Sequence, residues 1–115
     1  MSIVTVFRSR LREGVEEEYA AVAQKMSDLV RAVDGFVDQK FYVASDGERV
    51  TIVRFRDAAS HATWARHPDH LDAQRHGRDH FYSWYDISVC DELHHAVFDS
   101  PGEPSGSGVR RDDQS

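Results

Sequence analysis

Four of the seven histidines and both tryptophans lie in one stretch, residues 62–89, which reads ATWARHPDHLDAQRHGRDHFYSWYDISV. An imidazole can accept or donate a proton near neutral pH, and it is also a common metal ligand. Aromatic side chains can wall a pocket for a flat organic molecule, or they can pack in a core. This stretch therefore carries the residue types that could do chemistry, and the elements that position them decide which chemistry is available.

A metal site is one reading of these histidines. His76 and His80 are four residues apart, a spacing that puts two imidazoles on one face of a helix. Gly77 lies between them and the sequence offers no fixed third ligand, so we predict no bound metal. The single cysteine, Cys90, is expected inside a strand as a small packed side chain rather than as a nucleophile.

The composition limits what the stretch can belong to. A chain of 115 residues favours one domain, and a formal net charge of -6 with scattered arginines argues against a nucleic-acid surface. The N-terminus does not resemble a signal peptide, and no apolar run reaches the length of a membrane span. One cysteine cannot form an internal disulfide. We therefore expect a cytoplasmic protein with neither a nucleic-acid nor a membrane partner.

The first half of the chain predicts a strand, a helix and a hairpin. Residues 3–11 begin with a β-branched run and then alternate, which is typical of a strand. Apolar residues recur at steps of three and four over 15–33, the pattern of an amphipathic helix, and Gly35 suits the turn that ends it. Two alternating segments, 36–44 and 49–56, flank an Asp-Gly pair and predict a β-hairpin.

The second half predicts two short helices and a last strand. Asp57 suits an N-cap, and Pro68 restarts a helical segment because proline is tolerated in a first turn. Gly77 is expected to close or kink that segment. Aromatic and β-branched residues over 81–93 predict the last strand.

The chain end differs in composition from the rest. We expect residues 1–95 to form the domain and residues 96–115, rich in Ser, Gly and Pro, to form a flexible or disordered tail. His94, His95, Val97 and Phe98 either extend the last strand or clasp a partner.

The order strand, helix, strand, strand, helix, strand predicts an α+β, ferredoxin-like βαββαβ fold, with a four-stranded antiparallel sheet and both helical segments on one face. Asp86, on the last strand, is expected to pair with an arginine such as Arg54 across the sheet. The face without helices also carries apolar residues, which a second copy would bury most economically. We therefore predict a homodimer in which two sheets face each other.

Several short motifs carry a resemblance to a known family. The first strand ends in FRSRLREG, the helix opens with EEEY, a DGF junction follows it, and the hairpin contains GERVTIVRF. Residues 64–70 have the pattern W-x-x-H-P-x-H, AQ follows, and the last strand has F-Y-x-x-Y-x-I-x-V-C. Over about residues 2–93 the sequence resembles the antibiotic biosynthesis monooxygenase domain of the dimeric α/β-barrel superfamily.

The resemblance implies a small cofactor-independent monooxygenase acting on an aromatic polyketide-like or quinol substrate, which loses a proton and reacts as its carbanion with dioxygen. Such a substrate supplies its own electrons, so no cofactor is expected. The implied base is His70, with His67 second, because an imidazole can accept a proton at neutral pH. Trp64 either walls the pocket, donating its indole N–H to a developing oxyanion, or fills the core.

The same resemblance implies the substrate contacts. Tyr82 and Tyr85 are expected to donate phenolic hydrogen bonds, and Phe7 and Met26 to contact the ligand. Structural alternatives exist for two residues. Met26 belongs to the apolar stripe of the first helix, and His67, beside a proline, can satisfy a helix terminus.

Two other functions stay open. Haem-degrading relatives imply a Trp in the short helix, a His ligand further on and an Asn on the first strand. This sequence keeps Trp64 and offers His70 or His76, but it contains no asparagine, so bare haem binding is what remains of that alternative. The third possibility is a non-catalytic dimeric module that binds a hydrophobic metabolite.

Overall fold

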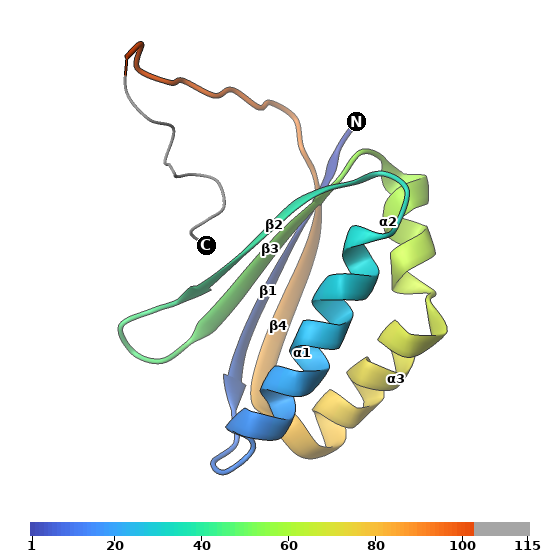
Figure 1. Cartoon of the computed structure of the whole chain (residues 1–115), viewed down its shortest axis with the longest axis vertical. Coiled ribbons are helices and arrows are strands. Elements are labelled where there is room, and N and C mark those ends of the chain that lie inside the picture. Colours follow the sequence, from blue (N-terminus) through green and yellow to red (C-terminus); the bar gives the residue numbers. More distant parts are fainter. Residues whose placement is uncertain (103–115) are drawn as a thin grey trace.

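A computed structural model describes residues 1–102, and its centre is a four-stranded antiparallel sheet (Figure 1). The strands are β1 (Ile3–Leu11), β2 (Phe36–Val43), β3 (Arg49–Phe55) and β4 (Tyr82–Asp91). Their order across the sheet is β2-β3-β1-β4, so the first strand lies inside the sheet between the second hairpin strand and the last strand.

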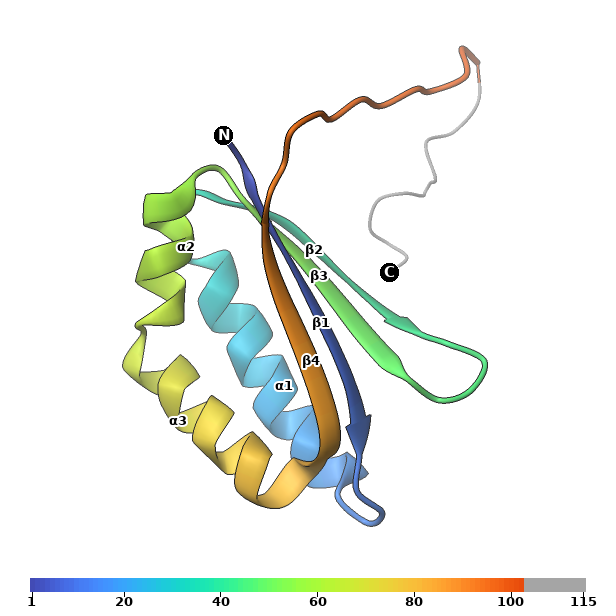
Figure 2. The ribbon, with the colours of Figure 1, turned by 180° about the vertical axis from the view of Figure 1, so that it is seen from behind.

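All helical segments cover one face of this sheet, as the two opposite views show (Figures 1 and 2). They are α1 (Glu16–Arg31), α2 (Ala58–Ala65), α3 (Pro68–His76) and a π-helical turn, η1 (Gly77–Phe81). The fold is the predicted ferredoxin-like α+β arrangement. Among the described residues, no helix is long and apolar enough to cross a membrane.

The core lies between the sheet and the helices. Its fully packed side chains are Ile3, Val30, Phe55 and Trp64, one each from β1, α1, β3 and α2, and Phe55 is 0% exposed. The register explains this arrangement. Ile3 is the direct partner of Phe55 in the sheet, so the two side chains lie side by side on the helix face.

Local signals start the short helices where the sequence predicts. The Asp57 carboxylate accepts a hydrogen bond from the backbone N–H of Ser60 at 2.9 Å and so caps α2. Pro68 occupies the first turn of α3. α3 ends at His76 with Gly77 as its C-cap, as the sequence predicts. The backbone of Gly77 stays helical with φ -60°, and the chain continues through the π-helical turn η1 to Phe81, so the helix type changes there.

The predicted Asp86–Arg54 pair is also wrong. Arg54 instead bonds Asp38 at 3.1 Å and Glu92 at 3.0 Å, on the neighbouring strand and just beyond β4. Asp86 is the direct sheet partner of Arg8. The register of β1 against β4 decides this, because it sets Arg8, not Arg54, opposite Asp86.

The last strand ends sooner than predicted. β4 stops at Asp91, so residues 94–98 do not extend it, and Leu93, Val97 and Phe98 are 72–84% exposed. In Figure 2 this segment runs away from the sheet. Most of the tail predicted over residues 96–115 lies outside the described residues, which end at 102.

Gly35 offers a test of the connection between α1 and β2. Its φ is +94°, and a Cβ placed there would lie 1.8 Å from the Ser60 hydroxyl oxygen. We expect Gly35→Ala to lower the free energy of unfolding by about 1–3 kcal/mol, from backbone strain and the clash with α2. Gly14→Ala is the matched control, because Gly14 has φ +83° but nothing within 4 Å of its Cβ position. Urea denaturation measures both, and equal losses would show that the clash contributes nothing.

Candidate functional site

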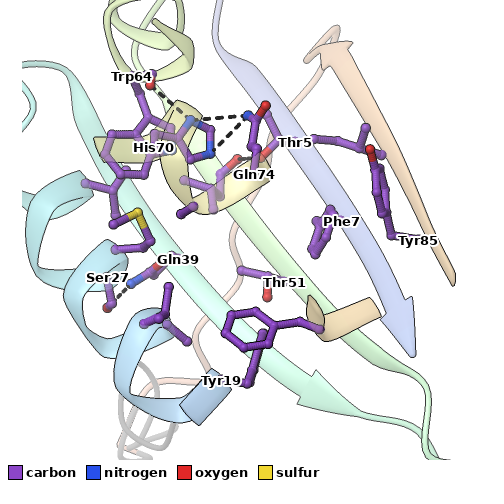
Figure 3. A pocket seen from close by; sticks show the side chains of 18 of the residues that line it. Thr5, Phe7, Tyr19, Ser27, Gln39, Thr51, Trp64, His70, Gln74 and Tyr85 are labelled. Atoms are coloured by element: carbon purple, nitrogen blue, oxygen red, sulfur yellow. Dashed lines mark hydrogen bonds between the residues drawn. The ribbon is translucent and has the colours of Figure 1, made fainter. Parts of the chain in front are cut away.

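A cavity of about 300 Å³ lies between the sheet and the helices (Figure 3). Side chains from all four strands form its floor, and side chains from α1, α2, α3 and η1 form its walls. Six of the seven predicted site residues line it: Phe7, Met26, Trp64, His70, Tyr82 and Tyr85. Its volume is at the lower end of the range typical of small-molecule sites.

His70 and Trp64 contact each other in the cavity wall. Their rings stack with centroids 4.4 Å apart and an interplanar angle of 19°. The His70 Nδ1 lies 3.1 Å from the Trp64 carbonyl oxygen. A carbonyl can only accept, so Nδ1 carries the proton and donates it. In the neutral ring, Nε2 then holds the lone pair that can take a proton from a ligand, and the Gln74 amide nitrogen lies 3.4 Å from it as a weak donor.

The burial of His70 keeps its ring in the state that a base needs. Desolvation lowers the pKa of His70 below its ordinary value, while the hydrogen bond to the Trp64 carbonyl acts in the opposite direction. The nearby His67 and His61 lower the pKa of His70 further. Near neutral pH the imidazole is therefore mostly neutral, with Nε2 ready to accept.

This lowered pKa predicts a measurable pH dependence. In an NMR titration we expect the His70 ring to protonate below the ordinary midpoint of about 6.5. The unfolded chain then binds more protons than the folded chain in that range. The contribution of His70 to stability is thus complete above about pH 6.5 and is lost as the pH falls through the folded pKa. A midpoint above 6.5 for His70 would contradict this.

A cluster of aromatic side chains lies at the end of the cavity opposite His70. Phe7 lies 5.4 Å from Tyr82 and 5.6 Å from Tyr85, measured between ring centroids, and Tyr19 of α1 lies 6.0 Å from Tyr82. Burial raises the pKa of the Tyr82 phenol well above its usual range, and Tyr19 raises it further. Tyr82 is therefore a neutral hydroxyl that can donate a hydrogen bond.

Gly77 is required for the position of Tyr82. A Cβ on Gly77 would lie 2.5 Å from a carbon of the Tyr82 ring, so with any larger residue the ring or the backbone would have to shift. The glycine that the sequence suggests as a helix breaker thus serves close packing between η1 and the start of β4.

The cavity also contains residues that the sequence analysis did not select. Thr5 and Thr51 come from the sheet, Gln39 bonds Ser27 across the gap between β2 and α1, and His61 comes from α2. The alternation of the strands could have predicted that the two threonines face the cavity. Each lies two positions from a cavity or core residue of its own strand, and such residues share one face of a sheet. Gln39 follows an irregularity in the β2–β3 register between Phe36 and Asp38, so alternation alone does not place it.

His67 lies outside the cavity lining. Its Nδ1 accepts a hydrogen bond from the Asp69 backbone N–H at 3.1 Å, so it caps α3. This is the structural alternative that its position beside a proline suggests. Its ring still lies 5.7 Å from Trp64, behind the wall of the cavity.

His76 and His80 are neighbours but lie away from the cavity. Their ring centroids are 4.5 Å apart, and His76 Nε2 lies 3.1 Å from a carboxylate oxygen of Glu18. Within residues 1–102, no group of three or more His, Cys, Asp or Glu side chains is arranged to hold a metal ion.

Taken together, these observations describe a ferredoxin-like domain with an aromatic-walled cavity between its sheet and its helices. The family model of the antibiotic biosynthesis monooxygenases matches residues 2–76 of the sequence. The chain therefore belongs to the antibiotic biosynthesis monooxygenase family. No curated protein matches it.

Solved structures support the same fold. Rv0793 from Mycobacterium tuberculosis is 20% identical, with a TM-score of 0.75 over 84% of this chain and 100% of that chain. SnoaB, a cofactor-independent oxygenase from Streptomyces nogalater, is 16% identical, with a TM-score of 0.70 over 82% of this chain and 95% of that chain. At these identities the likeness concerns the fold alone.

Proposed function

We propose that the protein is a cofactor-independent monooxygenase that oxidises an electron-rich aromatic substrate, of the anthrone or hydroquinone type, in the cavity between sheet and helices. The observation that carries this proposal is His70: a half-buried, neutral imidazole at an aromatic-walled cavity, whose unprotonated Nε2 lies 3.4 Å from the Gln74 amide nitrogen. Membership of the family and the likeness to an oxygenase fold add support.

The proposed reaction needs one base and one molecule of dioxygen. With an anthrone, His70 Nε2 takes a proton from the ring methylene carbon, and the resulting carbanion is stabilised as its phenolate form. The carbanion gives its electrons to dioxygen. One oxygen atom becomes the new ring carbonyl and the other leaves as water, so anthrone and dioxygen give anthraquinone and water. The substrate is oxidised and dioxygen is reduced, without another reductant.

The aromatic residues have two proposed roles. The stacked Trp64 fixes the plane of the His70 ring and provides an apolar wall for the substrate. Tyr82 and Tyr85 lie within reach of one another, at 5.7 Å between ring centroids, on the opposite wall. A phenol that stays neutral can donate a hydrogen bond to the substrate oxygen on which negative charge develops.

Oxygen uptake tests the proposal. The protein is incubated with a panel of anthrones and hydroquinones, with EDTA and without added cofactor, while dissolved oxygen is recorded and the product mass is measured. We expect uptake above the buffer rate and, for an anthrone, a product with two hydrogens replaced by one oxygen. If no member of the panel consumes oxygen faster than buffer, the proposed activity is wrong, and a binding module is the better description.

We also propose that the protein is a cytoplasmic homodimer. Val6 and Ile52 are direct sheet partners, and they alternate with cavity-lining residues of their strands, so they lie on the face of the sheet without helices. A second copy would bury this apolar face. In solution we expect a mass of twice 13.1 kDa.

A charge on this face should prevent dimerisation. Val6→Asp is expected to give a folded monomer, because an unpaired carboxylate would be buried between the sheets. Ala21→Asp, on the exposed surface of α1, is the matched control and should stay dimeric. Light scattering at micromolar protein concentration measures the molar mass of the wild type and of both variants. A monomeric wild type would contradict the proposal, as would a dimeric Val6→Asp variant.

A further inference from the structure

Arg49 occupies an unusual position at the start of β3. It is the direct sheet partner of Ser9 and Val43 and lies on the helix side of the sheet. The central carbon of its guanidinium group is 5.3 Å from the ring centroid of Tyr19 and 5.2 Å from that of Phe41. Two aromatic rings thus hold the cation in a fixed place, which favours a guanidinium over a flexible ammonium group.

The hydrogen-bonding capacity of Arg49 is unused. Its Nε is buried and has no hydrogen-bond partner, the one such side-chain atom among the described residues. Other arginines of the sheet bond carboxylates: Arg8 bonds Glu48, and Arg54 bonds Asp38 and Glu92. Within residues 1–102, no carboxylate lies within 4.0 Å of the Arg49 guanidinium. Burying a charged donor without an acceptor is costly, so this Nε–H is suited to an acceptor that a bound ligand supplies.

Arg49 also lines a second cavity, of about 410 Å³, which adjoins the first. The two cavities share the lining residues Tyr19, Ala23, Ser27, Gln39 and Thr51. Neither cavity is lined by an aspartate or a glutamate, whereas Arg49, Lys40 and Arg31, which pairs with Asp28 at 4.0 Å, line the second. In a chain of net charge -6, this is a local environment that favours an anion.

Arg49 and the His70 region lie at opposite ends of the combined space. Trp64 packs in the core beside Phe55 and Val53, at the far end of β3. Arg49 is four residues from Val53, which is about 13 Å along a strand. Figure 3 shows the corresponding separation on the helix side, with Tyr19 at one end of the cavity and Trp64 and His70 at the other.

We propose that Arg49 is a substrate-positioning residue that binds the carboxylate of an aromatic acid, while the ring to be oxidised lies against Trp64 and His70. This inference rests on the proposed function for the role of His70 and adds the class of substrate. The Nε–H and one Nη–H of a guanidinium point in parallel, so together they match the two oxygens of a carboxylate. An anchored carboxylate also fixes which end of an elongated molecule reaches the base.

A pair of fluorescent probes that do not turn over tests this proposal. 2-Anthracenecarboxylate and 2-anthracenecarboxamide have the same shape and differ in charge. We expect the wild-type protein to bind the carboxylate about tenfold or more tightly than the amide, because a charge-assisted hydrogen bond is stronger than a neutral one. In Arg49→Gln this preference should disappear, with the carboxylate weakened about tenfold or more and the amide changed less than about twofold. Arg49→Lys, which keeps the charge but loses the parallel donors, should retain part of the preference.

Two comparisons distinguish recognition of the carboxylate by Arg49 from a role of Arg49 in the shape of the cavity. Arg75→Gln removes an exposed arginine whose ion-pair partner among residues 1–102 is Asp72 of the same helix, and it should leave both affinities unchanged. If Arg49→Gln weakens both probes equally, Arg49 only supports the shape of the cavity and the proposal is wrong. It is also wrong if the wild type does not prefer the carboxylate or binds neither probe.

The binding test is independent of the proposed activity. A preference for the carboxylate that depends on Arg49, found in a protein that consumes no oxygen, would uphold the anion site and refute the oxygenase. Oxygen consumption without that preference would refute the anion site alone.

Discussion

Replacing His70 with alanine is expected to lower kcat for the best substrate of the panel by about 100- to 10,000-fold, the range typical of a lost general base. The ring that accepts the proton is removed, while most of the apolar walls remain. The comparison is made under saturating substrate, by oxygen uptake. KM should change much less than kcat, because His70 contributes only one part of the cavity wall.

His76→Ala is the matched control for this loss. His76 lies on the same helix, but its ring faces Glu18 outside the cavity, and its removal should leave kcat within about twofold. His70→Gln separates two roles of the side chain, since an amide can still donate to the Trp64 carbonyl but cannot act as a base. A His70→Gln variant with wild-type kcat would show that His70 only orders the wall.

Replacing Phe55 with alanine is expected to lower the free energy of unfolding by about 3–5 kcal/mol. Phe55 is 0% exposed and packs with Ile3, Val30 and Trp64, so its truncation opens a cavity where β1, β3, α1 and α2 meet. Because native domains are marginally stable, such a loss is a large part of the whole. Guanidinium denaturation measures it.

Phe55→Leu is the control for this prediction. Leucine fills much of the space, so the loss should be about 1.5 kcal/mol or less. Phe55 also lies 5.5 Å from His61, which lines the functional cavity. If alanine and leucine cost the same, the site is not closely packed and the proposed core is wrong.

Most of the fold can be predicted from the sequence, because its elements follow from local patterns: alternation in strands, the spacing of apolar residues in helices, and turn signals. The alternation over residues 3–11, the helical spacing over 15–33 and the Asp-Gly turn predict β1, α1 and the β2–β3 hairpin within one or two residues. Asp57 and Pro68 start α2 and α3 by local chemistry, capping and a fixed φ angle, which depends on few distant contacts.

Features set by distant contacts were not predicted. Gly77 ends α3 as the sequence predicts, but its close approach to the Tyr82 ring has no signal in the local sequence pattern. The partner of Arg54 depends on the registers of both neighbouring strands, and these place Asp38 and Glu92 beside it.

The same distinction between local patterns and distant contacts applies to the candidate site. His70 and Trp64 are six residues apart across a proline, and their stacking follows from the local joint between α2 and α3. Their selection from the sequence was therefore possible. The sequence alone does not distinguish Arg49 from any other arginine in a β-hairpin. Only the structure shows that its Nε has no partner and that Tyr19 and Phe41, from two other elements, pack against its guanidinium group.

The most direct test of the central claim is hydrogen exchange at the methylene carbon of anthrone, in D2O and without oxygen. The claim is that His70 removes a proton from a bound aromatic substrate, and this step needs no dioxygen. Mass spectrometry follows the uptake of deuterium. We predict that the wild-type protein and His76→Ala accelerate the exchange, whereas His70→Ala leaves it at the buffer rate. Equal acceleration by wild type and His70→Ala would contradict the role of His70 as the base.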